Sequence, residues 1–354
     1  MRTSIAGLFN ANRSNVCHGI SCVLAAGVMG SVIVLSSHAY SDTVPAEFNS
    51  ARATAALKPL SLDGNQAQTN ELVDYLKYYK LTFADTIRYS GTFQSGEKTL
   101  AAHVFVPRNS RAVVFLLHGY YDHTGIQRNI IAHLLSENFT VVIYDQPGHG
   151  LSDGKRASID NFDEYLMVFR DFVNIITCQL PGPYHVVAHS MGCSPVIEHL
   201  LNGNSDCIQR IVLIAPLIRS AAWHIAGIGN AAAGLFVDSV PRVFRKNSSD
   251  RDFLTFLKND PLQTKHVPTK WICALRTWNK KIEAYSGSPR KMLVIQGTKD
   301  TTVAWRHNMQ FISVKFPNAK IIFVEEGGHQ LINESSAIRN RIFRMISGYL
   351  NKPE

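Results

Sequence analysis

Charged residues are scarce in this chain of 354 residues, and no long run of like charges occurs in it. Asp, Glu, Lys and Arg make up 18% of the residues, whereas 45% are hydrophobic. This balance excludes an intrinsically disordered chain and provides for a sizeable core. The 23 glycines and 14 prolines are too few for a collagen-like protein. The formal net charge is +9, but without a zinc-finger or RNP pattern it does not indicate a nucleic-acid partner.

Cysteine is also sparse, with six residues in the chain. Their spacing matches no zinc site and no CxxC motif, so the cysteines do not predict a metal site. Cys178 and Cys207 are each predicted near the end of a helix that leads into a neighbouring strand, at the same edge of a sheet. A disulfide between them is one interpretation. The other is that Cys178, Cys193, Cys207 and Cys273 are four buried thiols.

Acidic residues are absent from the first 41 positions. Arg2 and Arg13 precede an uncharged apolar stretch at residues 20–35, and Ser37-His38-Ala39 follows it. A basic start, an apolar run and a small-x-small triplet are typical of a secretory signal peptide. Residues 1–39 are therefore predicted to direct export to the periplasm or the exterior. The alternative is an uncleaved membrane anchor, for which the apolar run is short of the about 20 residues that span a bilayer.

Short apolar runs alternate with helical stretches over most of the chain. Residues 86–93 and 100–106 flank a polar turn and predict an antiparallel hairpin. Later runs are continuously apolar, as buried parallel strands are. These runs are residues 112–117, 140–144, 184–188, 208–214, 291–295 and 320–324. Helical stretches separate them, so the fold class is α/β, with a mostly parallel sheet covered by helices on both faces.

The alternation is interrupted between residues 214 and 291, where no clear strand is visible. Residues 221–240 are small and apolar, and a helical pattern with aromatic side chains follows. We interpret this segment as a helical cap over the carboxyl ends of the strands; an ordinary packed helical subdomain is the alternative. The predicted boundaries are 40–84 for a leader and N-terminal helix, 85–217 and 289–354 for the core, and 218–288 for the cap.

One apolar run ends in a serine at the start of a predicted helix. Residues 188–192 read Ala-His-Ser-Met-Gly, a near match to the G-x-S-x-G nucleophile elbow. The positions two residues from the serine must be small, because strand and helix approach closely there. Ala188 replaces the first glycine and is the least disruptive exception. Ser190 is the predicted nucleophile, and the helix N-terminus beneath it favours developing negative charge.

Two later strands are each followed by a residue that would complete a catalytic triad. Asp300 lies in the loop after the run at 291–295, and His329 lies in the loop after the run at 320–324. The order Ser190, Asp300, His329 is that of hydrolases built on a nucleophile elbow. His329 would take the proton of Ser190, and Asp300 would orient the imidazole. Taken singly, Asp300 also fits a helix N-cap and His329 a solvated loop residue.

The loop after the run at 112–117 is the candidate oxyanion loop. Residues 118–123 read His-Gly-Tyr-Tyr-Asp-His. The backbone N–H groups of Tyr120 and Met191 are the predicted oxyanion-hole donors, because one donor should follow the nucleophile and the other should come from this loop. His118 and His123 resemble metal ligands, but no other ligand spacing supports a metal site. They are interpreted as packing and loop-bracing residues.

These segments resemble the α/β-hydrolase family of monoacylglycerol lipases and lysophospholipases, which is classed with the serine aminopeptidase-like S33 hydrolases. Residues 145–154, Asp-Gln-Pro-Gly-His-Gly-Leu-Ser-Asp-Gly, and residues 259–262, Asn-Asp-Pro-Leu, also carry the resemblance. It covers about residues 85–350. The resemblance implies the α/β-hydrolase fold, ester hydrolysis without a cofactor, and a structural role for residues 145–154 in bracing the oxyanion loop. Ala188 and Cys193 depart from the family, which usually has glycine there.

The favoured function is hydrolysis of carboxylic esters, most simply of monoacylglycerol or lysophospholipid type. One alternative is a serine aminopeptidase or iminopeptidase, which must neutralise the substrate amino group, but the predicted cap contains few acidic residues. A non-catalytic lipid-binding homologue is a second alternative, and an intact triad argues against it. Epoxide hydrolases and dehalogenases are disfavoured because they place an acidic residue, not serine, at the elbow.

The predicted cap is strongly basic. Residues 218–288 contain eleven Lys and Arg residues, five acidic residues and several aromatic ones, including Trp223, Phe244, Trp271 and Trp278. Basic and aromatic residues together are typical of proteins that dock onto anionic lipid surfaces. The alternative is that the aromatic residues form the core of the cap and the charges only solvate its surface.

Overall fold

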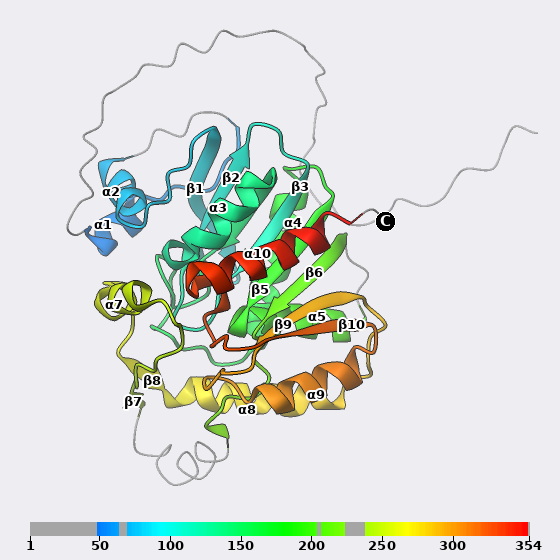
Figure 1. Ribbon diagram of the computed structural model, residues 1–354. Helices are drawn as coiled ribbons and strands as arrows, with labels where there is room; N and C mark the ends of the chain where they lie inside the picture. The colour runs from blue at the N-terminus through cyan, green and yellow to red at the C-terminus, as the bar shows by residue number, and fades with distance from the viewer. Residues whose placement is uncertain (1–47, 64–68, 204–206, 224–237, 353–354) are drawn as a thin grey trace, which may run out of the picture. The chain divides into compact units, whose positions relative to one another are not determined.

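The computed structural model describes residues 48–63, 69–203, 207–223 and 238–352. Val44–Glu354 forms one compact unit. Its centre is an eight-stranded sheet in the order β1-β2-β4-β3-β5-β6-β9-β10 (Figure 1). The predicted signal segment, residues 1–39, lies outside the described residues. Every helix in the described part of the chain is too short or too polar to cross a membrane.

The strands of the sheet confirm the predicted fold class. β1 (Thr86–Ser95) and β2 (Lys98–Pro107) form the predicted antiparallel hairpin, and β2 pairs antiparallel with β4. The remaining pairs are parallel. The other strands are β3 (Ala112–Leu117), β4 (Phe139–Tyr144), β5 (Tyr184–His189), β6 (Ile208–Ile214), β9 (Met292–Gly297) and β10 (Ala319–Val324).

The register of the central strands aligns their carboxyl ends. Leu117 at the end of β3 pairs with Ala188 in β5, and His189 at the end of β5 pairs with Ile214 at the end of β6. Ile214 in turn pairs with Ile295 in β9. The loops that follow these strands therefore emerge at one edge of the sheet, which is where open α/β sheets place their functional sites.

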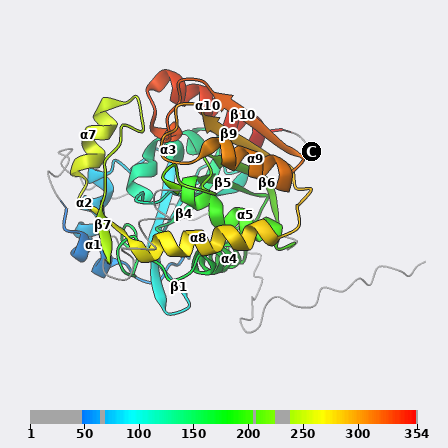
Figure 2. The ribbon, with the colours of Figure 1, turned by 90° about the horizontal axis from the view of Figure 1, so that it is seen from below.

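Helices lie on both faces of the sheet (Figure 2). The buried hydrophobic residues of the strands and helices form two clusters. Phe115 and Val186 face one cluster while their neighbours Val114 and Val187 face the other, as the two-residue period of a strand requires. The first cluster includes residues of α4 (Asp163–Thr177), α5 (Cys193–Leu201), α8 (Thr269–Ala284) and α9 (Trp305–Lys315). The second includes residues of α2 (Asn70–Tyr78), α3 (Arg128–Ser136) and α10 (Ser336–Leu350).

Two short features differ from the sequence expectation. The leader contains a helix, α1 (Ser50–Ala56), whose N-cap Asn49 accepts a hydrogen bond from the Arg52 backbone. The segment between β6 and β9 contains β7 (Ser239–Pro241) and β8 (His266–Pro268), which pair with each other. Strands of three residues are too short to produce a recognisable alternation. Most of the apolar stretch at 221–240 lies outside the described residues.

The two helices of this segment differ in burial. α7 (Arg251–Asn259) buries Leu257 and exposes most of its other residues. α8 is anchored in the first cluster, where Trp278 is fully enclosed and its indole N–H donates to Glu198 of α5 at 2.8 Å. Trp271 likewise donates to the hydroxyl of Tyr165 in α4 at 3.1 Å. Trp271 and Trp278 of α8 are therefore packed in the core and are not part of the surface.

The structure contradicts both interpretations of the cysteines, the disulfide and the four buried thiols. Cys178 and Cys207 are not joined in a disulfide, and both are exposed, as is Cys273. Only Cys193 among the four is buried. The prediction of four buried thiols is therefore wrong; Cys178 is exposed because it is the C-cap of α4, at the end of a helix.

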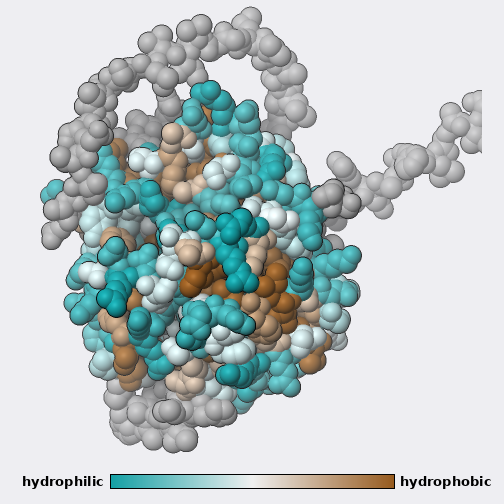
Figure 3. Space-filling view, in the orientation of Figure 1, coloured by the Kyte–Doolittle hydropathy of each residue, from teal (hydrophilic) through white to brown (hydrophobic). Residues whose placement is uncertain are grey.

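The surface is mostly hydrophilic on the face shown in Figure 3, with an apolar area over the region of β9 and β10. β10 is the edge strand of the sheet, and Phe323 on it is 45% exposed.

Candidate active site

Ser190 sits on a sharp turn between β5 and the helix that follows. Its φ is +53°, in the left-handed region that non-glycine residues rarely adopt. A Cβ at Gly192 would lie 2.6 Å from the carbonyl oxygen of Leu117, so only glycine fits there. Ala188 and Cys193 are both fully buried, and the Cys193 thiol donates to the carbonyl oxygen of Ala188 at 3.2 Å. The two departures from the family pattern are thus accommodated in the elbow.

The structure brings Ser190, His329 and Asp300 into one hydrogen-bonded chain. His329 Nε2 lies 2.9 Å from Ser190 Oγ, and His329 Nδ1 lies 2.7 Å from Asp300 Oδ2. All three residues are buried. This geometry allows a proton to pass from the serine to the imidazole while the carboxylate stabilises the imidazolium that forms.

Asp300 is fixed by further donors. Its Oδ1 accepts hydrogen bonds from the backbone N–H groups of Thr302 at 2.8 Å and Val303 at 3.1 Å. Its Oδ2 also accepts from the Gln296 amide at 3.1 Å. Burial alone would raise the pKa of Asp300, but the charge and hydrogen bond of His329 and the two backbone donors lower it below its ordinary value. Asp300 is therefore an ionised acceptor at neutral pH.

The loops that carry Asp300 and His329 pack directly on each other. A Cβ at Gly297, the last residue of β9, would lie 2.4 Å from the carbonyl oxygens of both Gly327 and Gly328. Lys299 N donates to the carbonyl oxygen of Gly327 at 2.9 Å. Gly297 at the end of β9 and the two glycines after β10 thus permit the close approach that holds the carboxylate beside the imidazole.

The predicted oxyanion loop passes close to the nucleophile. Asp122 N donates to Gly119 O at 3.1 Å and closes a turn in which Tyr121 has φ +70°. A Cβ at Gly119 would lie 3.0 Å from Ser190 Cβ. Tyr120, inside this turn, stacks on Trp271 at 3.8 Å between ring centroids. The turn that contains Tyr120 therefore approaches Ser190 through Gly119, and Met191 directly follows Ser190 in the sequence.

No motif in the sequence marks Asp122 or His189 as functional residues, yet both lie beside Ser190 and His329. His189 Nε2 is 3.0 Å from the carbonyl oxygen of His329, and its Nδ1 is 3.4 Å from Asp122 Oδ2. Gln330 donates to Asp122 Oδ1 at 3.1 Å. Burial alone would raise the pKa of Asp122, but its interaction with His189 lowers it to about 2. These contacts tie the oxyanion loop to the histidine loop.

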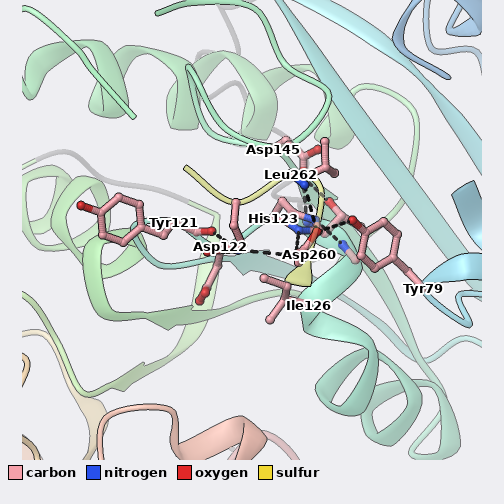
Figure 4. A network of polar contacts seen from close by, with 12 residues as sticks. Tyr79, Tyr121, Asp122, His123, Ile126, Asp145, Asp260 and Leu262 are labelled. Carbon is pink, nitrogen blue, oxygen red and sulfur yellow. Dashed lines mark hydrogen bonds and ion pairs between the residues drawn. The ribbon is translucent and has the colours of Figure 1, made fainter. Parts of the chain in front are cut away.

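A second buried network anchors the oxyanion loop to the segment after α7 (Figure 4). The Asp260 carboxylate accepts from the Tyr79 hydroxyl at 2.7 Å and from His123 Nε2 at 2.8 Å. It also accepts from Leu262 N at 3.0 Å. The His123 and Asp260 side chains have no exposed surface. His123 thus braces the loop, as predicted, through a partner 137 residues away in the sequence.

Residues 145–154 brace the same loop from the other side. Asp145 Oδ1 accepts from the backbone N–H of Thr124 at 2.7 Å, and its Oδ2 accepts from Leu151 N at 2.8 Å. His118 Nε2 accepts from Gln146 N at 2.9 Å. Among the residues that the structure describes, no group of three or more His, Cys, Asp or Glu side chains is arranged to hold a metal ion.

A cavity of about 550 Å³ opens beside Ser190 and His329. Its wall combines Tyr120 and Tyr121 of the oxyanion loop with residues from the segment between β6 and β9. Apolar residues of that segment in the wall are Ala221, Ala222, Pro241, Val243, Phe244, Leu254, Leu257 and Val267. A cavity of this size and lining suits an organic substrate with an apolar part.

The comparisons with known proteins agree with this architecture. Monoglyceride lipase of Homo sapiens is 29% identical over 256 residues, which are 68% of this chain and 83% of the human protein. The monoglyceride lipase homolog of Monkeypox virus is 25% identical over 250 residues, 68% of this chain and 89% of the viral protein. The solved structure of a soluble variant of monoglyceride lipase from Saccharomyces cerevisiae, in complex with a substrate analog, matches with a TM-score of 0.64 at 17% identity. That match covers 73% of this chain and 94% of the yeast chain and supports the fold.

The family itself is shown by a match over residues 108–336 to the model described as "Serine aminopeptidase, S33". This span is well over half of the chain. It begins just before β3 and ends at the first residue of α10, so it contains the elbow, both triad loops and the segment between β6 and β9. The chain therefore belongs to the serine aminopeptidase S33 family of α/β-hydrolases.

Proposed function

We propose that the protein is a serine hydrolase that cleaves carboxylic esters, of monoacylglycerol or lysophospholipid type, through an acyl-enzyme on Ser190. The observation that carries the proposal is the hydrogen-bonded chain from Ser190 through His329 to Asp300, with distances of 2.9 and 2.7 Å. Similarity to monoglyceride lipases supports an ester as the substrate. The apolar wall of the cavity beside Ser190 supports an acyl chain as part of it.

The proposed reaction has two halves. His329 Nε2 takes the Ser190 proton while Oγ attacks the ester carbonyl carbon, and the carbonyl electron pair moves onto oxygen. The backbone N–H groups of Tyr120 and Met191 stabilise that oxyanion. When the intermediate collapses, His329 gives its proton to the departing alcohol. A water molecule, deprotonated by His329, then attacks the acyl-enzyme. When this second intermediate collapses, His329 returns the proton to Ser190 Oγ, which releases the carboxylic acid and restores the free enzyme. Asp300 keeps the imidazole in the required tautomer throughout.

A substrate panel tests this proposal against the peptidase alternative. p-Nitrophenyl esters of increasing acyl length are compared with aminoacyl-nitroanilides, using the wild-type protein and Ser190→Ala. We expect turnover of esters that is lost in the variant and no turnover of the anilides. A peptidase of this kind must neutralise the ammonium group of its substrate. Among the described residues, Asp122 is the only acidic residue that lines the cavity, so the cavity offers little negative charge for that purpose. Efficient anilide cleavage would contradict the ester assignment.

We also propose that the protein is exported and that the segment between β6 and β9 docks onto an anionic lipid surface. Val243 is 74% exposed and Phe244 is 39% exposed, and the exposed Arg245 follows them. Trp271 and Trp278 are buried and take no part. Exposed apolar side chains next to basic ones favour an anionic interface. Sedimentation with anionic and neutral vesicles at low and high salt tests the proposal; equal binding to both vesicle types would contradict it.

A further inference from the structure

The cavity beside Ser190 has a strongly positive lining. Four basic side chains line it among the described residues, namely Arg242, Arg245, Lys246 and Lys258. The acidic residue of the described lining, Asp122, is only 2% exposed and is already engaged by Gln330 and His189. Within the described ranges, none of the four basic side chains forms an ion pair with a carboxylate. None of the four therefore has a carboxylate of a described residue within ion-pair distance, although the buried carboxylates of Asp122 and Asp260 attract Arg242 from farther away.

Arg242 differs from the other three because it is half-buried and held in place. Its guanidinium lies 3.8 Å from the ring centroid of Tyr121 and 4.4 Å from that of Phe244. Its Nη1 donates to Gln263 Oε1 at 2.6 Å and to Thr264 O at 3.3 Å, which are neutral acceptors. These contacts orient the guanidinium without cancelling its charge. A partly desolvated cation is costly unless an anion pairs with it, and cation–π contacts offset only part of that cost.

Arg242 is also placed close to the reaction centre. Tyr121, the ring beneath its guanidinium, belongs to the turn Gly119–Asp122 that closes at 3.1 Å. Gly119 in that turn is the residue whose Cβ would come within 3.0 Å of Ser190 Cβ. Tyr121 and Arg242 both line the cavity that contains Ser190. An anionic group bound by Arg242 would therefore lie in the same cavity as an ester at Ser190.

We propose that the substrate of this site is an ester that carries an anionic group, and that Arg242 binds this group. The inference rests on the proposed function, because it names the class of ester cleaved at Ser190. Arg245, Lys246 and Lys258, which are exposed, add positive potential at the entrance. The apolar residues of the same wall, such as Leu254 and Leu257, accommodate the acyl chain. A carboxylate and a phosphate each present two oxygen atoms that a guanidinium can bind at once, in a bidentate manner.

The test compares soluble octanoyl esters below their critical micelle concentrations, so that no lipid surface takes part. The substrates are neutral 1-octanoylglycerol, 1-octanoylglycerol 3-phosphate and octanoyloxyacetate, and released octanoate is measured for each. We expect the wild type to show a kcat/KM at least tenfold higher for the phosphate or the carboxylate ester than for the neutral ester, and the better of the two identifies the anion. A charge-assisted hydrogen bond of about 1.5–3 kcal/mol corresponds to a preference of roughly 10- to 100-fold.

Variants of Arg242 test whether this residue causes the preference for anionic esters. In Arg242→Gln the ratio of anionic to neutral kcat/KM should fall to near one, whereas Arg242→Lys should retain part of it. The control is Arg251→Gln, an exposed basic residue at the start of α7 that does not line the cavity, and its ratio should equal that of the wild type. Melting temperatures of all variants separate lost recognition from lost folding.

The outcomes separate the two proposals. If the wild type cleaves none of the three esters, the proposed ester hydrolysis fails. If it cleaves the neutral ester as fast as or faster than both anionic ones, ester hydrolysis stands and the anionic substrate class is overturned. If the anionic preference survives in folded Arg242→Gln, the role assigned to Arg242 is overturned.

Discussion

Replacing Asp260 by alanine removes the acceptor that joins three distant parts of the chain. The carboxylate is fully enclosed and accepts from Tyr79 of the segment after α2, from His123 of the oxyanion loop and from its own neighbour Leu262. In Asp260→Ala the Tyr79 hydroxyl and the His123 N–H lose their acceptor in a buried site. Each unsatisfied buried donor costs about 1–3 kcal/mol, and loss of one partner of a buried pair costs about 3–5 kcal/mol in total.

The expected consequence is a lower melting temperature and slower turnover. For a domain of this size about 1 kcal/mol corresponds to roughly 2 °C, so Asp260→Ala should melt roughly 6–10 °C below the wild type. Turnover should fall as well, because His123 lies next to the turn that carries Tyr120. Asp260→Asn keeps the shape of the side chain and one acceptor oxygen, so its loss should be intermediate.

Calorimetry of the purified variants measures the effect. The matched control is Asp252→Ala, which removes an exposed carboxylate from the same region and should change stability by no more than about 0.5 kcal/mol. The measurement also has a pH dependence. Burial alone would raise the pKa of Asp260, but His123 lowers it, so its stabilisation is present at neutral pH and is lost as pH falls through the folded-state pKa. The reasoning is refuted if Asp260→Ala and Asp252→Ala melt at the same temperature.

Three further predictions follow from the site geometry. The pKa of Asp122 is lowered to about 2 in the folded state, so its ionised form stabilises the fold and the advantage of the wild type over Asp122→Asn in unfolding free energy should be larger at pH 7 than at pH 3; equal differences at the two pH values in urea titrations would contradict this. Gly192→Ala places a Cβ 2.6 Å from the Leu117 carbonyl oxygen and should strongly lower the melting temperature, whereas Gly348→Ala, with open space around it, should not. Asp300→Asn should lower kcat on the order of 10⁴-fold with an unchanged circular dichroism spectrum; activity above a tenth of wild type would exclude its role.

The fold and the proximity of Ser190, Asp300 and His329 could be predicted because both leave local signals. Buried parallel strands appear as continuous apolar runs, and the runs at 112–117 and 208–214 coincide with β3 and β6 residue for residue. Ser190, Asp300 and His329 each follow such a run, and the carboxyl ends of parallel strands meet at one edge of the sheet. Their approach to within hydrogen-bonding distance is a consequence of that topology.

The contacts that support the triad could not be predicted, because they join segments far apart in the sequence. Asp122 and Gln330 are 208 residues apart, and no local pattern marks either as a partner. In the sequence Asp260 is marked only as part of the family-like segment 259–262, and its hydrogen bonds with Tyr79 and His123 depend on how the segment after α7 packs. The three-residue strands β7 and β8 are set by their mutual pairing, which no sequence periodicity reports.

Labelling with a fluorophosphonate, read by mass spectrometry of the intact protein and its peptides, tests the central claim most directly. We expect one label per chain, located on Ser190, and a loss of ester kcat/KM in Ser190→Ala on the order of 10⁴- to 10⁶-fold with an unchanged melting temperature. A label on another residue, or a folded Ser190→Ala protein that keeps more than a tenth of wild-type activity, would contradict it.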